Sequence, residues 1–281
     1  VSGYSSASSR QLVITVAASA PTLYYYCHVH SGMGGQINTN TDFGQTNFDG
    51  TILSTSTENT TAGFSIVRHA GSGSAGNIGH GLGAVPQVII TKNRSASADW
   101  AVYDAGIGNQ YYLRLNTDDY KATASSVWGD TTPTALDFRV GGANTKNNSS
   151  GNNFVSYCFT SIKGFSKMGA YTGNGNSDGT FVYTGFKPAW VMFKRTNGTN
   201  DWLIFDNKRS PFNLTEKVLY ANSNGAEQDD SQHSGSIDML SNGFKLKETG
   251  NSSNGNGALY FYMAFAESPF VATNNVVATA R

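Results

Sequence analysis

An internal repeat constrains this chain more than any other feature of its sequence. The stretches GLGAVPQVIITKNRSASADWAVYD, from Gly81, and TGFKPAWVMFKRTNGTNDWLIFD, from Thr184, follow one plan. A constant offset pairs Gly83 with Gly185, Pro86 with Pro188, Lys92 with Lys194, Asp99 with Asp201, Trp100 with Trp202 and Asp104 with Asp206. Because each copy of a repeat builds the same structural unit, this periodicity has to be recognised before single elements are assigned.

Each copy is typical of a β-hairpin with a long loop. Gly and Pro open it as a turn, and Pro is tolerated only at the start or the edge of a strand. An apolar run follows, at residues 88–90 and 190–193, and ends at a Lys and a turn of small residues. The second strand begins at the Asp-Trp pair, so the pattern predicts two antiparallel strands.

The repeat extends in both directions and sets the expected domain organisation. The letters GFS occur at residues 63 and 164, LxxN occurs at 113 and 219, and Phe138 matches Phe244. We therefore expect units at residues 63–163 and 164–270, each with short strands separated by turn signals. The predicted fold class is all-β: two tandem homologous β-sandwich (jelly-roll-like) units, preceded by a short strand-loop-strand segment.

The segment before the repeats, residues 1–40, contains YYYCHVHSGMGGQI. It resembles the last strand and ligand loop of a cupredoxin, and we interpret it as a cupredoxin-like remnant. Cys27, His30 and Met33 supply the thiolate, imidazole and thioether that a mononuclear copper site uses. No His precedes Cys27, so this copper-like set is incomplete, and we expect no cofactor. Residues 41–62 are predicted to be a linker, and residues 271–281 a C-terminal tail.

Composition and charge argue against several functions. Lys plus Arg equals Asp plus Glu, so the basic footprint of a nucleic-acid-binding protein is missing. No apolar run in the sequence has the length of a membrane-spanning helix, so we expect no membrane insertion. The chain begins at Val1 without Met, from which we expect a fragment or a processed product.

No catalytic constellation emerges from the sequence, and we expect a protein that is not an enzyme. The carboxylate pairs Asp118-Asp119 and Asp229-Asp230 follow the LxxN motif in both copies, and we interpret them as solvated loop charges. Trp128 lies in a predicted loop beside Gly129 and Asp130, so Trp128 and Asp130 are the candidate ligand-binding residues. Trp100 and Trp202 occupy equivalent strand positions and are predicted to be core.

Several long phrases are similar to stretches in structural proteins of marine tailed bacteriophages. They are LYYYCHVHSGMGGQINTNTDFGQTNFDGTI, HGLGAVPQVIITKNR, YTGNGNSDGTFVYTGFKPAWVMFKRT and LYFYMAFAESPF. The resemblance implies a virion surface protein of the phage tail, a tail fibre that assembles as a homotrimer with other virion proteins. It also implies binding to a host-cell receptor, which we expect to be a glycan.

Two further readings stay open at this point. One is a head-decoration protein, or another purely structural virion component without a receptor role. The other is a secreted carbohydrate-binding protein, a glycan-active enzyme or a copper protein. The enzyme would need carboxylates that converge across loops, and the copper protein would need the missing His.

Overall fold

A computed structural model describes residues 23–26, 34–37, 44–123, 125–229 and 235–267, the first two ranges by their backbone alone. The chain divides into two compact units, Val1–Gln45 and Thr46–Arg281. In the first unit, β1 (Leu23–Tyr26) and β2 (Gly34–Ile37) form an antiparallel hairpin. Cys27, His30 and Met33 lie outside the described residues, as does the predicted tail at 271–281.

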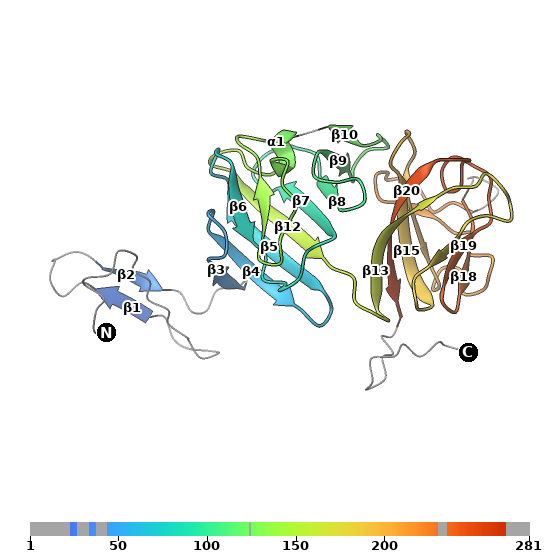
Figure 1. The fold of residues 1–281 in the computed structure, drawn as a ribbon, viewed down its shortest axis with the longest axis horizontal. Coiled ribbons are helices and arrows are strands. Elements are labelled where there is room, and N and C mark those ends of the chain that lie inside the picture. The colour runs from blue at the N-terminus through green and yellow to red at the C-terminus, as the bar shows by residue number, and fades with distance from the viewer. Residues whose placement is uncertain (1–22, 27–33, 38–43, 124, 230–234, 268–281) are drawn as a thin grey trace. The chain divides into compact units, whose positions relative to one another are not determined.

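The described part of the second unit is built from antiparallel sheets with almost no helix, which confirms the predicted all-β class (Figure 1). Its first half contains one large sheet and one small sheet. The large sheet has the order β10 (Ala122–Thr123), β9 (Tyr111–Arg114), β8 (Ala101–Asp104), β7 (Val88–Asn93), β12 (Asn153–Phe159), β5 (Phe64–Ala70), β4 (Ser54–Asn59) and β3 (Gln45–Asn47). The small sheet pairs β11 (Asp137–Val140) with β6 (Gly76–Gly79), and a short helix, α1 (Ser125–Trp128), follows β10.

The second half contains a corresponding pair of sheets. The larger has the order β13 (Ser166–Thr172), β20 (Leu259–Ala266), β15 (Pro188–Arg195), β16 (Trp202–Asp206) and β17 (Leu219–Tyr220). The smaller has the order β14 (Phe181–Tyr183), β19 (Gly243–Leu246) and β18 (Ile237–Leu240). Read from β17, the order β17-β16-β15-β20-β13 matches β9-β8-β7-β12-β5 strand for strand. Each sheet pair is consistent with a β-sandwich, and we refer to the first and second sandwich.

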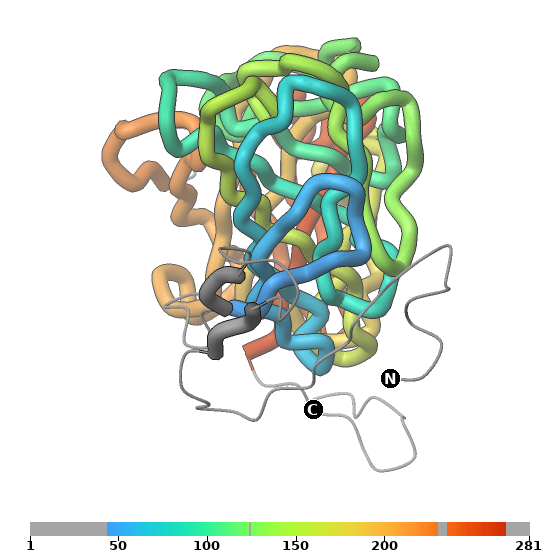
Figure 2. The backbone as a smooth tube through the Cα atoms, turned by 90° about the vertical axis from the view of Figure 1, so that its left-hand side faces the viewer, coloured from blue at the N-terminus to red at the C-terminus, as the bar shows by residue number. Residues whose placement is uncertain are grey.

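Strands β3 and β4 fall within residues 41–62, which the sequence predicted to be a linker. That prediction is wrong for these strands, because β4 pairs along its whole length with β5 in the large sheet. In Figure 2 this part of the chain, coloured blue, lies on the side of the first sandwich that faces the reader. Apolar and polar residues do not alternate clearly along β4, because its sequence, STSTEN, buries small hydroxyl side chains instead of apolar ones. Its polar composition therefore hid a strand.

Three hydrophobic cores hold this unit together. The first core lies between the two sheets of the first sandwich and includes Ile89 and Phe138, and the second core lies in the second sandwich and includes Phe193 and Phe244. The third, the central core, combines residues of both large sheets. Its buried members are Val88, Ile90, Val102 and Leu113 from the first sandwich and Met168, Met192, Trp202, Phe261 and Met263 from the second.

The central core explains why the first strand of each hairpin, β7 and β15, contains a continuous run of apolar residues. Successive side chains of a strand point to opposite faces of its sheet. On β7, Ile89 belongs to the first core while Val88 and Ile90 belong to the central core. On β15, Phe193 belongs to the second core and Met192 to the central core. Both faces of β7 and β15 are therefore buried along these runs, which is why successive positions carry apolar residues.

Polar contacts also join the two sandwiches. The indole Nε1 of Trp202 donates a hydrogen bond to the carbonyl of Arg114 at 2.8 Å. The ammonium of Lys194 donates to the carbonyl of Asp118 at 3.0 Å, and the amide of Asn200 donates to the same carbonyl at 2.9 Å. The segment after β9 is thus bonded to the β15–β16 hairpin of the second sandwich.

Candidate functional site

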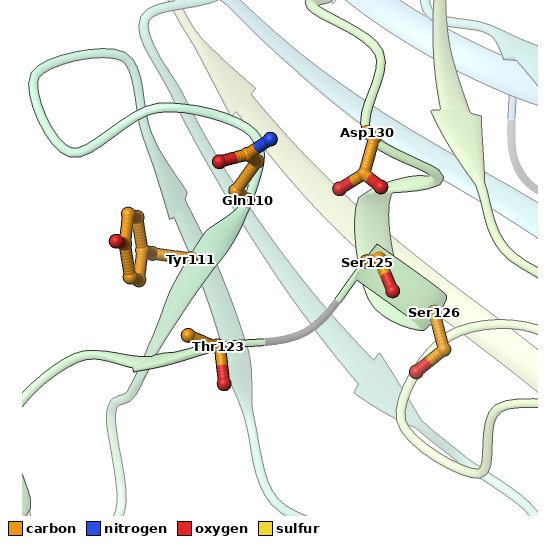
Figure 3. A pocket seen from close by; sticks show the side chains of 6 residues that line it. All are labelled: Gln110, Tyr111, Thr123, Ser125, Ser126 and Asp130. Carbon is orange, nitrogen blue, oxygen red and sulfur yellow. The ribbon is translucent and has the colours of Figure 1, made fainter.

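A shallow hollow opens at the β9–β10 edge of the first sandwich (Figure 3). Its volume is about 410 Å³. The side chains around it are polar except for one aromatic ring. They are Gln110, Tyr111, Thr123, Ser125, Ser126 and Asp130. We call this set the polar hollow.

One side of the polar hollow is formed by α1, which is anchored in the first core. Val127 and Trp128 are buried in the first core, so the short helix is pinned by its apolar side while Ser125 and Ser126 stay exposed. The side-chain amide of Asn147 donates to the carbonyl of Val127 at 2.6 Å. These contacts hold the two serines of α1 at the rim.

Trp128 itself is a core residue. Its side chain is 2% exposed and meets the ring of Tyr103 edge-on, with the ring centroids 5.8 Å apart. The sequence predicted an exposed loop and a ring that contacts ligand, but the segment is helical and the ring has no open face. The sequence misled here because a Trp beside Gly-Asp resembles a loop tip, whereas an apolar pair on one helix turn is a core signal.

Asp130 reaches the polar hollow through an unusual backbone conformation. Gly129 and Asp130 both have positive φ, 55° and 49°. Asp is one of the few residues besides Gly that adopts this region readily, because its short polar side chain hydrogen-bonds locally. The hydroxyl of Thr131 donates to the carbonyl of Gly129 at 2.9 Å and closes the turn. The turn directs the Asp130 carboxylate toward Ser125 and Gln110 (Figure 3).

Tyr111 is the aromatic member of the site. It lies opposite Thr123 in the β9–β10 ladder. The ammonium of Lys121 lies 4.2 Å from the centroid of its ring, within the range of a cation–π contact. This contact limits the orientations of the Tyr111 ring.

A second depression, of about 440 Å³, adjoins the polar hollow and shares Thr123 with it. The guanidinium of Arg114 lies in its wall, 2.8 Å from the carboxylate of Asp119 and 3.3 Å from that of Asp99. Arg114 also donates to the hydroxyl of Tyr112 at 2.8 Å. Its charge is therefore compensated locally, while Tyr120 in the same wall is exposed.

The chemistry of the polar hollow suits recognition of hydroxyl groups. A carboxylate accepts hydrogen bonds, an amide donates and accepts, and hydroxyls do both. A pair of carboxylates flanking one bond is what glycoside hydrolysis requires. The described lining of the hollow contains one carboxylate, that of Asp130. The arrangement thus offers hydrogen-bond donors and acceptors to the hydroxyl groups of a ligand.

Among the described residues, the other tryptophans and the carboxylate pairs discussed above do not line the polar hollow. Trp202 is buried in the central core, and Trp100 packs against that core, both in agreement with their predicted core role. Asp119 pairs with Arg114, and Asp118 faces the hairpin of the second sandwich through its carbonyl. Asp230 lies outside the described residues.

Sequence reasoning missed most of the hollow. Gln110, Thr123, Ser125 and Ser126 belong to no motif in the sequence. The one signal in the sequence that pointed to the hollow was Gly129-Asp130, because such a dipeptide favours a positive φ and a tight turn.

Two wider searches of the described residues gave negative results. They contain no group of three or more His, Cys, Asp or Glu side chains arranged to hold a metal ion. Within the same residues, no helix combines the length and the apolar character needed to cross a membrane.

The fold and the site together define an all-β protein with two packed sandwiches and a polar hollow at a sheet edge. The chain belongs to the family described as a domain of unknown function (DUF7483), whose model matches residues 38–269. No curated protein and no solved structure matches the chain.

Proposed function

We propose that this chain is a non-enzymatic surface protein of a phage particle, part of a tail fibre, that binds a glycan on the host cell. The observation that carries the binding role is the polar hollow, in which Asp130, Gln110 and three hydroxyl side chains surround a depression beside the ring of Tyr111. Sugars combine hydroxyl groups with apolar C–H faces, so a ligand of this class matches both parts of the lining.

The virion assignment is supported by the phrase-level resemblance to phage structural proteins. The corresponding strand orders of the two sandwiches support a second part of the proposal, a tandem duplication of one jelly-roll-like unit. In addition, the polar hollow lies where β9 pairs with β10 and where α1 is anchored in the first core, which favours a preorganised site over one that must fold around its ligand.

The binding role is tested by applying the purified chain to immobilised glycans of the host surface. We expect Asp130→Ala and Tyr111→Ala to weaken retention at least tenfold, because each removes a direct contact. Asp49→Ala, which removes an exposed carboxylate elsewhere in the first sandwich, is the matched control. Unchanged retention for both hollow variants would exclude this site as the receptor site.

The proposed trimer is tested separately by light scattering on the purified chain. A mass three times that of the chain supports a fibre. A monomer at all concentrations contradicts self-assembly and favours a decoration protein, whose place on the particle can be found by labelling.

A further inference from the structure

Two aromatic side chains project from the outer face of the second sandwich. On β14, Phe181 and Tyr183 are 44% and 60% exposed, whereas Val182 between them is buried in the second core. The strand period of two therefore places both rings on the same side, facing away from the core. Such neighbouring exposed rings are unusual for surface positions, which are mostly polar.

A glycine of the neighbouring strand lies beside these rings. In the β14–β19 ladder Tyr183 lies opposite Gly243, and Phe181 lies opposite Lys245. A Cβ atom added at Gly243 would come within 3.0 Å of two carbons of the Phe181 ring, so this ring rests directly on the β19 backbone. The lack of a side chain at Gly243 makes the contact possible. We call Phe181, Tyr183, Gly243 and Lys245 the aromatic face.

The first sandwich shows that the fold does not need aromatics there. The equivalent positions on β6 and β11 carry Asn77, Gly79, Asp137 and Arg139, with Gly79 standing where the second sandwich has Tyr183. These side chains satisfy one another: the amide of Asn77 donates to the carboxylate of Asp137 at 2.9 Å, and Arg139 donates to the amide oxygen of Asn77 at 3.1 Å. A self-contained polar patch in one copy is thus replaced by exposed rings in the other, which indicates a role other than folding.

Polar groups border the aromatic face. Lys245 forms an ion pair with Asp178, whose side chain is 80% exposed. The ammonium of Lys167 on β13 lies 6.0 Å from the centroid of the Tyr183 ring. Charged donors and an acceptor therefore stand beside the rings, where they can bond groups at the rim of a ligand that stacks on them.

The size of the face favours a small repeating ligand over a protein partner. Two half-exposed rings offer on the order of 200 Å² of apolar surface, since a fully buried aromatic side chain covers about 150–250 Å². A stable protein interface buries about 800 Å² on each partner. The charged border of Lys245, Asp178 and Lys167 also leaves no continuous apolar surface for such an interface.

We infer that the aromatic face binds an uncharged pyranose glycan, with C–H faces of the sugar rings stacked on Phe181 and Tyr183 and hydroxyl groups bonded to Lys245 and Asp178. This site lies in the second sandwich, and the polar hollow lies in the first. It therefore does not depend on the polar hollow, and either site can fail without the other.

The test is affinity electrophoresis of the full chain in native gels that contain hydroxyethylcellulose, laminarin or alginate. We expect retardation in at least one of the two uncharged polysaccharides. The Phe181→Ala/Tyr183→Ala double variant should bind at least tenfold more weakly, while Tyr183→Phe, which keeps the ring, should bind as well as the wild type. Phe212→Ala, which removes an exposed aromatic outside this face, should leave this binding unchanged.

Several results would overturn the inference. They are a lack of retardation in both uncharged gels, equal retardation of the double variant and the wild type, or stronger retardation in alginate, which would indicate an acidic ligand. Light scattering addresses a protein partner: a wild-type oligomer that becomes a monomer in the double variant would make this face a contact between copies of the chain. Far-UV circular dichroism of the double variant verifies that it is folded.

Discussion

At the scale of single residues, equivalent positions of the two sandwiches carry the same residue in different environments. Asp206 receives hydrogen bonds from the backbone amides of Lys208 and Arg209 and an ion pair from the Arg209 guanidinium at 2.6 Å. Burial alone would raise its pKa, but these contacts lower it below the ordinary value. Asp104 has Ile107 where Asp206 has Arg209, and its Oδ2 atom is buried without a hydrogen-bond partner.

Asp104 is therefore a destabilising carboxylate near neutral pH. Burial raises its pKa to about 6, against the opposing effect of hydrogen bonds from the amides of Gly106 and Ile107. The folded state keeps a proton that the unfolded state loses above pH 3.8, so stability falls as pH rises from 3.8 to 6. We expect Asp104→Asn to raise the free energy of unfolding by about 1–2 kcal/mol at pH 8 and to change it little at pH 4.

Urea unfolding at both pH values measures this effect. Asp206→Asn is the matched control and should destabilise the protein, because it weakens the pair with Arg209. A lower stability of Asp104→Asn at pH 8 would contradict the prediction.

His69 contributes a pH dependence of the opposite sign. The ring is buried against Phe154, and Nε2 lies 2.9 Å from the carbonyl of Asn147, to which it donates. Burial lowers its pKa to about 4, although the hydrogen bond to Asn147 raises it somewhat. The unfolded state binds a proton near pH 6.5 and the folded state does not, so stability is lost as pH falls from 6.5 to 4.

We expect the wild type to lose about 2 kcal/mol of unfolding free energy through His69 between pH 7 and pH 5. In His69→Gln this part of the loss should vanish, although the variant itself is less stable at pH 7. The measurement is the difference between the unfolding free energies of each protein at the two pH values. Equal differences for both proteins would show that His69 does not titrate in this way.

At the scale of elements, the β15–β16 hairpin is held by a buried lysine. The ammonium of Lys194 donates to the carbonyl of Asn200, across the hairpin loop, at 2.6 Å and to the carbonyl of Asp118, in the first sandwich, at 3.0 Å. Its counterpart Lys92 donates to the carbonyl of Ala98 in the corresponding loop. The Lys found in both repeats therefore closes the hairpin, and in the second sandwich it also bonds across to the first.

Burial lowers the pKa of Lys194 to about 8, against the attraction of Asp118, Asp201 and Asp119. The unfolded state holds its proton up to about pH 10.5, so stability rises as pH increases from 8 toward 10.5, and the neutral amine can still donate to both carbonyls. We expect the wild type to gain about 2 kcal/mol between pH 8 and pH 10 relative to Lys194→Met.

Chemical denaturation of both proteins across this pH range tests the gain. Lys92→Met, at the equivalent position of the first sandwich, should still show the increase in unfolding free energy between pH 8 and pH 10. If the stability difference between wild type and Lys194→Met is independent of pH, Lys194 does not change protonation in this range.

At the scale of the whole unit, the central core makes the two sandwiches interdependent. Trp202 is fully buried among residues of both large sheets and donates its indole N–H to the carbonyl of Arg114. Removing either sandwich would expose one face of the other large sheet. We therefore expect one cooperative unfolding transition instead of two.

Trp202→Ala tests this interdependence. It should lower the free energy of unfolding by about 3–5 kcal/mol, the usual cost of deleting a large buried aromatic side chain. Hydrogen exchange should increase in β7 and β8 of the first sandwich as well as in β15 and β16. Phe205→Ala, which opens a cavity in the second core alone, is the comparison variant. An increase confined to the second sandwich for Trp202→Ala would show that the two sandwiches unfold independently.

Local sequence signals were sufficient to predict the all-β class and most of the strands in the two repeats. Gly-Pro turns, β-branched and aromatic runs and the Asp-Trp pair are local signals, and they act within one hairpin wherever it stands. Strand β4 was missed because a strand that buries serines lacks the apolar alternation on which such predictions depend.

The packing of the sheets determines which face of each strand meets which core, and where the candidate sites lie. A fully apolar strand does not reveal whether its second face meets a partner sheet, and the central core required both large sheets to be placed. Trp128 became core because α1 folds over the first sandwich. The residues around the polar hollow all come from the stretch 110–130, but they meet only because β9 pairs with β10 and α1 packs on the first core, and this folding back leaves no periodic mark in the sequence.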